Sequence, residues 1–291
     1  MPLLHASILL IAAQLATVAL AGDVDDAAAT TAGIAASFRQ EVDRVLTFSE
    51  QVADGYAALA RDTLARSGLT LDGDQFVVVV DRSPKVQAML VLWLAGERGQ
   101  LIGASPVSTG LPGRFDHFET PLGAFDHTPA NPDFRAEGTR NENGIRGYGV
   151  KGMRVFDLGW QQARRGWGDG RLSTIRLQMH ATDPDLLEAR LGTPQSKGCI
   201  RIPRSLDTWL DVHGVLDADY DALPAADARR WVLRRDRLPV QGAGRYVVVV
   251  ETPPVDPPIE ASPSDPSSQE SPQDDGVGAT PSCLARCEGK H

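Results

Sequence analysis

The spacing of apolar positions changes near residue 75. Between residues 24 and 66 the apolar residues recur at intervals of three, four and seven, which places them on one stripe of a helix. This stripe consists of Ile34, Phe38, Val42, Val45, Val52, Tyr56 and Leu59. Gly55 is a candidate interruption, and Ser67 with Gly68 is typical of a helix end. The pattern predicts an N-terminal helical segment that packs on the main domain.

From residue 76 the pattern is typical of short strands. A valine-rich run covers 76–80, and the apolar stretches 86–94 and 100–107 flank a Gly-Glu-Arg-Gly turn. Further strands are predicted at 123–125, 150–157, 172–180 and 246–250, and helices at 184–191, 205–212 and 225–234. Residues 131–149 are rich in Gly, Asn and Arg and are interpreted as a long loop. We therefore expect a mainly β fold with flanking helices.

The first residues have the features of an export signal. Residues 8–20 are apolar apart from Gln14 and Thr17, and the run ends in Ala-Leu-Ala, a small-x-small cleavage pattern before Gly22. The run is shorter than the roughly 20 apolar residues that span a bilayer. No Lys or Arg precedes it, so an uncleaved anchor or a buried helix are the alternatives. We expect cleavage after Ala21, no membrane span in the mature chain, and a place in the periplasm or cell envelope.

The last forty residues differ in composition from the rest. Residues 252–291 hold eight of the chain's 20 prolines among Ser, Asp and Glu, which predicts a disordered acidic tail. Cys283 and Cys287 fit a small disulfide loop, or a metal pair with His291. The expected organisation is a signal peptide at 1–21, a helical segment at 22–70, a catalytic domain at 71–251 and the tail.

Charge and length narrow the possible functions. The chain has 291 residues, 42% of them hydrophobic, enough for one sizeable core. Its net charge is −9, of which seven acidic against two basic side chains put −5 in the tail. No basic excess is available to neutralise a phosphate backbone, so we expect no nucleic-acid partner.

Cys199 stands in a sequence environment suited to a reactive thiol. It is the one cysteine outside the tail, and Lys197, Arg201 and Arg204 lie within five residues of it. A thiol attacks as its thiolate, which nearby positive charge or a base favours. Gly198 permits a tight turn in which successive N–H groups face a developing oxyanion. The bland alternative is a small buried hydrophobe.

His180 is the candidate base. It closes the predicted strand 172–180, and the segment 196–201 (Ser-Lys-Gly-Cys-Ile-Arg) follows it after fifteen residues. This arrangement resembles the signature of the L,D-transpeptidase (YkuD-like) family, a His followed by Ser/Thr-His-Gly-Cys-hydrophobic-Arg/Asn. Residues 107–110 (Val-Ser-Thr-Gly) and 120–125 (Thr-Pro-Leu-Gly-Ala-Phe) resemble the family's two strands before the active site. The likeness runs from about Phe76 to Leu210.

The resemblance implies a β-sandwich-like domain that acts on peptidoglycan stem peptides without a metal or cofactor. Cys199 would attack the L-to-D amide of a tetrapeptide stem and form a thioester. His180 would take the thiol proton and later activate the acceptor amine. The backbone carbonyl of Ala181 would orient the imidazole, with Asp183 as a side-chain alternative.

Further residues of the box have implied supporting roles. The N–H groups of Gly198 and Cys199 would hold the oxyanion, and Arg201 would pair with a substrate carboxylate. Ser196, Lys197 and Thr182 are the other candidate supporting residues. The bland alternatives are a turn cap for Ser196, a solvated charge for Lys197, and a brace to the helix at Ser205 for Arg201.

Two positions depart from the family pattern, and other functions stay open. Lys197 replaces the usual His and cannot shuttle protons as a His would, and Ala181 replaces a common Gly. A hydrolase with the same acyl-enzyme and a non-catalytic wall-binding protein are alternatives. So is a zinc hydrolase using His180 and Cys199, or a site formed with His117 and His127. Donor, acceptor and protein partners are not specified by the sequence.

Overall fold

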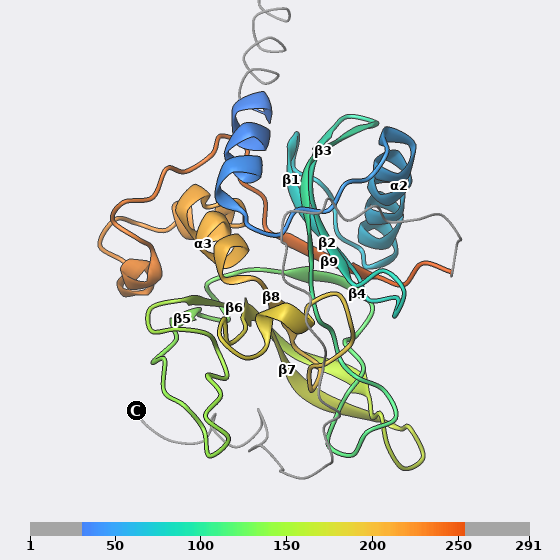
Figure 1. Cartoon of the computed structure of the whole chain (residues 1–291). Helices are drawn as coiled ribbons and strands as arrows, with labels where there is room; N and C mark the ends of the chain where they lie inside the picture. Colours follow the sequence, from blue (N-terminus) through green and yellow to red (C-terminus); the bar gives the residue numbers. More distant parts are fainter. Residues whose placement is uncertain (1–30, 254–291) are drawn as a thin grey trace, which may run out of the picture.

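The computed structural model describes residues 31–253 of the chain. The predicted signal peptide and the tail with Cys283 and Cys287 lie outside these residues. Within them, strands form two sheets, with helices at the N-terminal end and beside the core (Figure 1). The predicted mainly β fold is therefore confirmed. Between residues 31 and 253, no helix is both long and apolar enough to cross a membrane.

The first sheet is 5-stranded, in the order β3-β2-β1-β9-β4. Its strands are β1 (Gln75–Asp81), β2 (Ala88–Ala95), β3 (Arg98–Pro106), β4 (Gly123–Asp126) and β9 (Tyr246–Val250). The predicted hairpin joins β2 and β3, and β1 pairs in parallel with β9. All seven residues of β1 are buried, which explains why its sequence is a continuous apolar run without alternation.

The second sheet is 4-stranded, in the order β5-β6-β7-β8. Its strands are β5 (Phe134–Arg135), β6 (Arg154–Arg164), β7 (Leu172–Ala181) and β8 (Ile200–Ile202). The strand predicted at 150–157 begins later and runs further, because Gly152 takes a φ of +87° in a turn before β6. The short strands β5 and β8 have no periodic signal and were not predicted.

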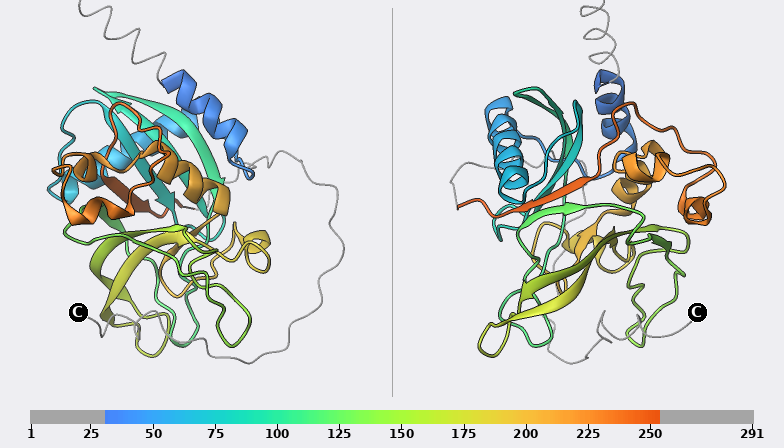
Figure 2. Two further views of the ribbon diagram at one scale, coloured as in Figure 1. Left: turned by 90° about the vertical axis from the view of Figure 1, so that its left-hand side faces the viewer. Right: turned by 180° about the vertical axis from the view of Figure 1, so that it is seen from behind.

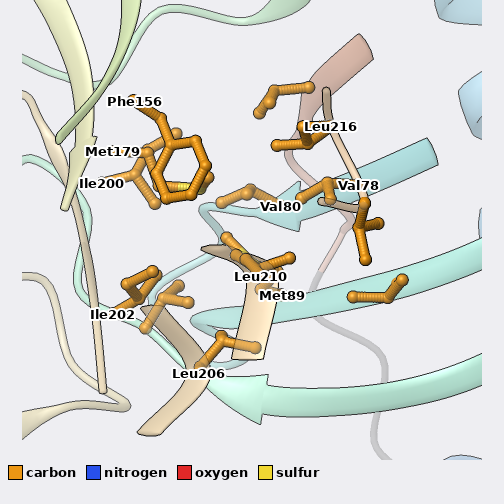
Figure 3. Close-up of a cluster of buried hydrophobic side chains, with 14 of the residues drawn as sticks. Val78, Val80, Met89, Phe156, Met179, Ile200, Ile202, Leu206, Leu210 and Leu216 are labelled. Atoms are coloured by element: carbon orange, nitrogen blue, oxygen red, sulfur yellow. The ribbon is translucent and has the colours of Figure 1, made fainter. Parts of the chain in front are cut away.

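The main core lies between the two sheets (Figure 3). Val78, Val80 and Met89 of the first sheet face residues of β6, β7 and β8 in this cluster. Helix α3 (Arg204–His213) closes it with Leu206, Trp209 and Leu210. The predicted helix at 205–212 is thus confirmed, and its apolar face is part of the inter-sheet core.

The N-terminal helical segment consists of two helices. Residues 31–41 form one, and α2 (Glu50–Arg66) covers the outer face of the first sheet (Figure 2). The break falls at 42–49 and leaves Gly55 inside α2, so the interruption predicted at Gly55 is wrong. The break is set by tertiary contact, since Leu46 N–H donates to the Ala104 carbonyl of β3 at 2.8 Å. The predicted end at Ser67 and Gly68 is confirmed.

Two predicted α-helices are short 3₁₀ turns instead. The segment 184–191 holds only Glu188–Arg190, and 225–234 holds only Ala228–Val232. In the first, the side chain of Asp183 accepts the N–H groups of Asp185 and Leu186, an Asx-type turn that competes with helix. A short helix α4 (Ala218–Asp221) was not predicted.

Candidate active site

Strand pairing brings the end of β7, with His180, next to the start of β8, which Cys199 directly precedes. In the parallel pair β7–β8, Met179 lies opposite Ile200 and His180 opposite Arg201. Met179 and Ile200 belong to the core between the sheets. Because side chains alternate along a strand, His180 and Arg201 project from the other face, and Cys199 directly precedes β8. His180 and Cys199 therefore lie on neighbouring segments, and Cys199 is two residues before Arg201, the register partner of His180.

The imidazole of His180 is held by the backbone of the next residue. Its Nδ1 lies 2.8 Å from the carbonyl oxygen of Ala181. A carbonyl oxygen only accepts, so Nδ1 carries the proton and Nε2 keeps its lone pair. Burial lowers the pKa of His180 to about 4, and the positive charge of Arg201 acts in the same direction against the hydrogen bond. At neutral pH the ring is an uncharged base.

Both side chains are covered in this structure. Cys199 is 4% exposed and His180 2%. The ring of Tyr148, from the long loop before β6, meets the His180 ring edge-on with centroids 4.7 Å apart. The Tyr148 hydroxyl also donates to the side-chain oxygen of Gln178 at 3.0 Å. Tyr148 is not among the predicted site residues, although a single tyrosine in a Gly/Asn/Arg-rich loop is a weak signal for such a contact.

The turn before Cys199 is closed by the hydroxyl of Ser196. This hydroxyl accepts the Gly198 N–H at 3.0 Å and donates to the Cys199 carbonyl at 2.6 Å. Gly198 has a φ of +127°, and a Cβ there would press against Phe118 and Ile175. Ser196 thus shapes the turn. Its bond uses the Gly198 N–H within the turn, and the oxyanion role of Gly198 and Cys199 stays a prediction.

The Thr-Pro-x-Gly segment also contacts this turn. Thr120 Oγ1 donates to the Gly198 carbonyl at 2.8 Å and accepts the Gly110 N–H at 2.9 Å. One threonine hydroxyl therefore connects the two segments, 107–110 and 120–125, to the residue before the cysteine.

Lys197 forms an ion pair with Asp116, in the segment before Phe118. Its Nζ lies 2.6 Å from Asp116 Oδ2, and its side chain is 14% exposed. The neighbouring Phe118 N–H donates to the Lys197 carbonyl at 3.2 Å. The lysine side chain is thus mostly covered by the protein and paired with a carboxylate.

Arg201 and Thr182 are fixed by backbone pairing. Arg201 exchanges two backbone hydrogen bonds of 2.9 Å with Ser108, in the segment that resembles the family's first strand. Thr182 is 1% exposed, and its N–H donates to Ile202 at 3.1 Å. The hydroxyl of Ser205 accepts the Asp43 N–H, so the N-terminal segment contacts α3 there.

The Asp183 carboxylate binds the loop that precedes β6. It is fully buried and accepts the Arg146 N–H at 2.7 Å, and the imidazole of His180 turns to Ala181 instead. His127 is also fully buried, between the Leu216 carbonyl and the Asp133 carboxylate. In the region 31–253, no group of three or more His, Cys, Asp or Glu side chains is arranged to hold a metal ion.

Comparison with known proteins covers this whole region. Residues 75–211 match the family model of YkuD, the L,D-transpeptidase catalytic domain. Among curated proteins, none matches the sequence. In the solved structures, Bd1075 of Bdellovibrio bacteriovorus shares 17% identity over 62% of this chain and 50% of its own, with a TM-score of 0.34. The helical cell shape determining protein Pgp2 of Campylobacter jejuni shares 13% over 64% and 51%, with a TM-score of 0.33.

The chain spans about half the length of these two solved proteins. The family match includes both β7 and β8, and with them His180 and Cys199. It also includes the 107–110 and 120–125 segments that contact the Cys199 turn. Residues 75–211 of this chain are a YkuD L,D-transpeptidase catalytic domain.

Proposed function

We propose that the chain is a cell-envelope enzyme that remodels peptidoglycan stem peptides through a thioester on Cys199, with His180 as the base. The observation that carries this proposal is the hydrogen bond from His180 Nδ1 to the Ala181 carbonyl at 2.8 Å. It leaves Nε2 unprotonated, and Cys199 lies two residues before Arg201, the register partner of His180. A neutral imidazole beside a thiol is the arrangement that nucleophilic catalysis requires.

The acylation step follows from these two groups. Nε2 of His180 takes the proton of the Cys199 thiol, and the sulfur attacks the carbonyl carbon of the L-to-D amide. The C–N bond breaks, and the imidazolium returns its proton to the leaving amine. The thioester then holds the acyl part of the stem peptide.

The second step regenerates the thiol. The neutral imidazole takes a proton from the acceptor amine, whose nitrogen attacks the thioester carbonyl. The C–S bond breaks, and the proton returns to Cys199. With water as the acceptor, the same steps trim the stem, so the acceptor separates a transpeptidase from a hydrolase.

The remaining candidate residues support this chemistry. Backbone N–H groups of the turn at Gly198 and Cys199 are proposed to face the oxyanion, which requires the Gly198 N–H to leave Ser196 as substrate binds. Lys197 and Arg201 supply positive charge beside the thiol, and Arg201 is proposed to pair with a substrate carboxylate. Thr182 is proposed to keep the Ala181 carbonyl in place through its bond to β8.

Carbapenem labelling tests the proposal. Opening of the lactam by Cys199 adds the mass of the drug to the intact protein, which mass spectrometry detects. Cys199→Ala should abolish the adduct, and His180→Asn should slow its formation by about 100-fold or more. The matched control is the double variant Cys283→Ala/Cys287→Ala, which removes the other thiols and should label normally.

Two results would contradict the proposal. One is an adduct that persists in Cys199→Ala, and the other is a wild-type chain that binds wall sacculi but takes up no label. Where labelling succeeds, product analysis on purified wall fragments assigns the acceptor, since new cross-links indicate an amine and shortened stems indicate water.

A further inference from the structure

The β6–β7 ladder ends at His180. Its last pair on this side joins Val155 to His180, and the next two residues, Arg154 and Ala181, are not paired with each other. The carboxylate of Asp207, from the first turn of α3, lies there instead. Its Oδ1 accepts the Arg154 N–H and its Oδ2 the Ala181 N–H, each at 3.2 Å. The Asp207 side chain therefore bridges β6 and β7 at the position where the two strands are no longer paired.

Asp207 is connected to the imidazole of His180 through the backbone of Ala181. The peptide plane before Ala181 is fixed by the bond from its N–H to Asp207. In the plane after Ala181, the carbonyl accepts the His180 Nδ1–H and the N–H of Thr182 donates to Ile202. Releasing the first plane would free the rotation that carries the Ala181 carbonyl, and with it the partner of the imidazole.

Asp207 is suited to this position because each of its two oxygens accepts one of the two backbone N–H groups. Asp207 is fully buried, so any backbone N–H that it leaves without a partner would be an unsatisfied buried donor. An asparagine would accept one N–H with its oxygen and turn its NH₂ group toward the other.

The surroundings of Asp207 disfavour its ionised form. Burial and the negative charge of Asp211 raise the pKa of Asp207 to about 8, while the two backbone donors and Arg135 favour the ionised form. With this pKa the side chain is mostly the neutral acid at pH 7. It still differs from an amide, because both of its oxygens carry lone pairs for the two N–H groups.

We propose that Asp207 is a positioning residue for His180, which it orients by holding the Ala181 peptide at the end of β7. This role rests on the proposed function of His180 as the base. Asp207 acts through the backbone, because its bond on this side is to the N–H of Ala181.

The test combines kinetics with a direct readout of the ring. Asp207→Asn should lower the maximal rate of carbapenem acylation by about 10- to 100-fold while half-saturation changes little. In ¹⁵N-histidine NMR of the full chain, the wild type should show the His180 proton on Nδ1. The variant should show a mixture of the two tautomers.

The matched control is Asp211→Asn, one turn further along α3. Asp211 is 2% exposed and bonds to Arg154 and Arg135, but it does not contact Ala181. This variant should lose stability and keep both the acylation rate and the tautomer. A role of Asp207 in packing alone would make the two variants behave alike.

A backbone variant keeps the proposal testable if Asp207→Asn does not fold. Replacing Ala181 with the α-hydroxy acid lactate turns one amide into an ester and removes only the N–H that Asp207 accepts. It should reproduce the slower acylation and the mixed tautomer. A folded variant of either kind with wild-type rate and tautomer would overturn the proposal. A wild type without any adduct would instead refute the proposed function, and the NMR readout would still decide the role of Asp207.

Discussion

At the scale of single residues, the chemistry depends on the environment of His180. An exposed histidine would be partly charged near neutral pH, but burial and Arg201 keep this ring neutral. The same shift affects stability. The folded pKa of about 4 lies below the unfolded value of 6.5, so the unfolded chain binds more protons between them. The contribution of His180 to stability is therefore lost as pH falls from 6.5 toward 4.

The rate of acylation should depend on pH in the same way. We expect the acid limb of the carbapenem labelling rate to have an apparent pKa near 4 and not near 6.5. Arg201→Gln removes a positive charge that lowers the pKa of His180, so the limb should move to higher pH. Stopped-flow labelling across the acidic range measures both values. Arg204→Gln is the control, because Arg204 is exposed and is not among the charges that act on His180. A limb that stays in place in Arg201→Gln would refute this electrostatic account.

At the scale of elements, a buried arginine connects β6 to α3 and to the residues that precede β5 and α4. Arg154 of β6 is fully buried and forms ion pairs with Asp133, Asp211 and Asp217. These acids lie before β5, in α3 and before α4. The guanidinium also lies over the rings of Phe156 and Tyr220. The network connects α3 and the residues before β5 and α4 to β6.

Removing the arginine should therefore destabilise the fold strongly. Arg154→Met leaves buried carboxylates without their cation, which is expected to lower the free energy of unfolding by about 3–5 kcal/mol. Urea unfolding followed by circular dichroism gives the difference. Arg66→Met is the control, because its pair with Asp62 is exposed and is expected to contribute under about 1 kcal/mol. Equal losses in the two variants would show that the buried network adds nothing beyond a surface pair.

At the scale of the whole molecule, the N-terminal helices share their packing with the sheets. Phe38, from the helix at 31–41, is fully buried in the inter-sheet core and meets Trp209 of α3 edge-on at 4.9 Å. Trp209 Nε1 donates to the hydroxyl of Ser37 at 3.0 Å. The sequence pattern predicts a boundary between a helical segment at 22–70 and a domain at 71–251. Because of these contacts, we expect the helical segment and the domain to unfold together.

Truncation of this contact tests that cooperativity. Phe38→Ala should lower the free energy of unfolding by about 3–5 kcal/mol through lost packing and a residual cavity. Tryptophan fluorescence and far-ultraviolet circular dichroism should still report one transition in the variant. Leu59→Ala, at a position that is 38% exposed in α2, is the control and should change stability little. Two separate transitions in the wild type would instead support an independent helical unit.

Local pattern was sufficient for the longer elements of this molecule. The valine run gives β1 and the Ser67 and Gly68 pair ends α2, because each depends on neighbours in the sequence. The predicted helix at 184–191 was wrong because bonds from the Asp183 carboxylate to the backbone replaced helical ones. The segment 225–234 forms only the 3₁₀ turn Ala228–Val232. The order of His180 and the 196–201 segment was also enough to indicate the family.

Contacts between residues distant in the sequence were decided by the tertiary structure. Tyr148 over His180, Asp116 beside Lys197 and Asp207 beneath Ala181 are all side chains that no periodicity connects to their partners. The sequence by itself determined which residues are the candidates for the proposed chemistry, since a thiol, an imidazole and a glycine turn are properties of residue type and order. The folded chain decided the proton position on His180 and the partners of the turn, because burial and hydrogen bonding arise only when distant segments pack together.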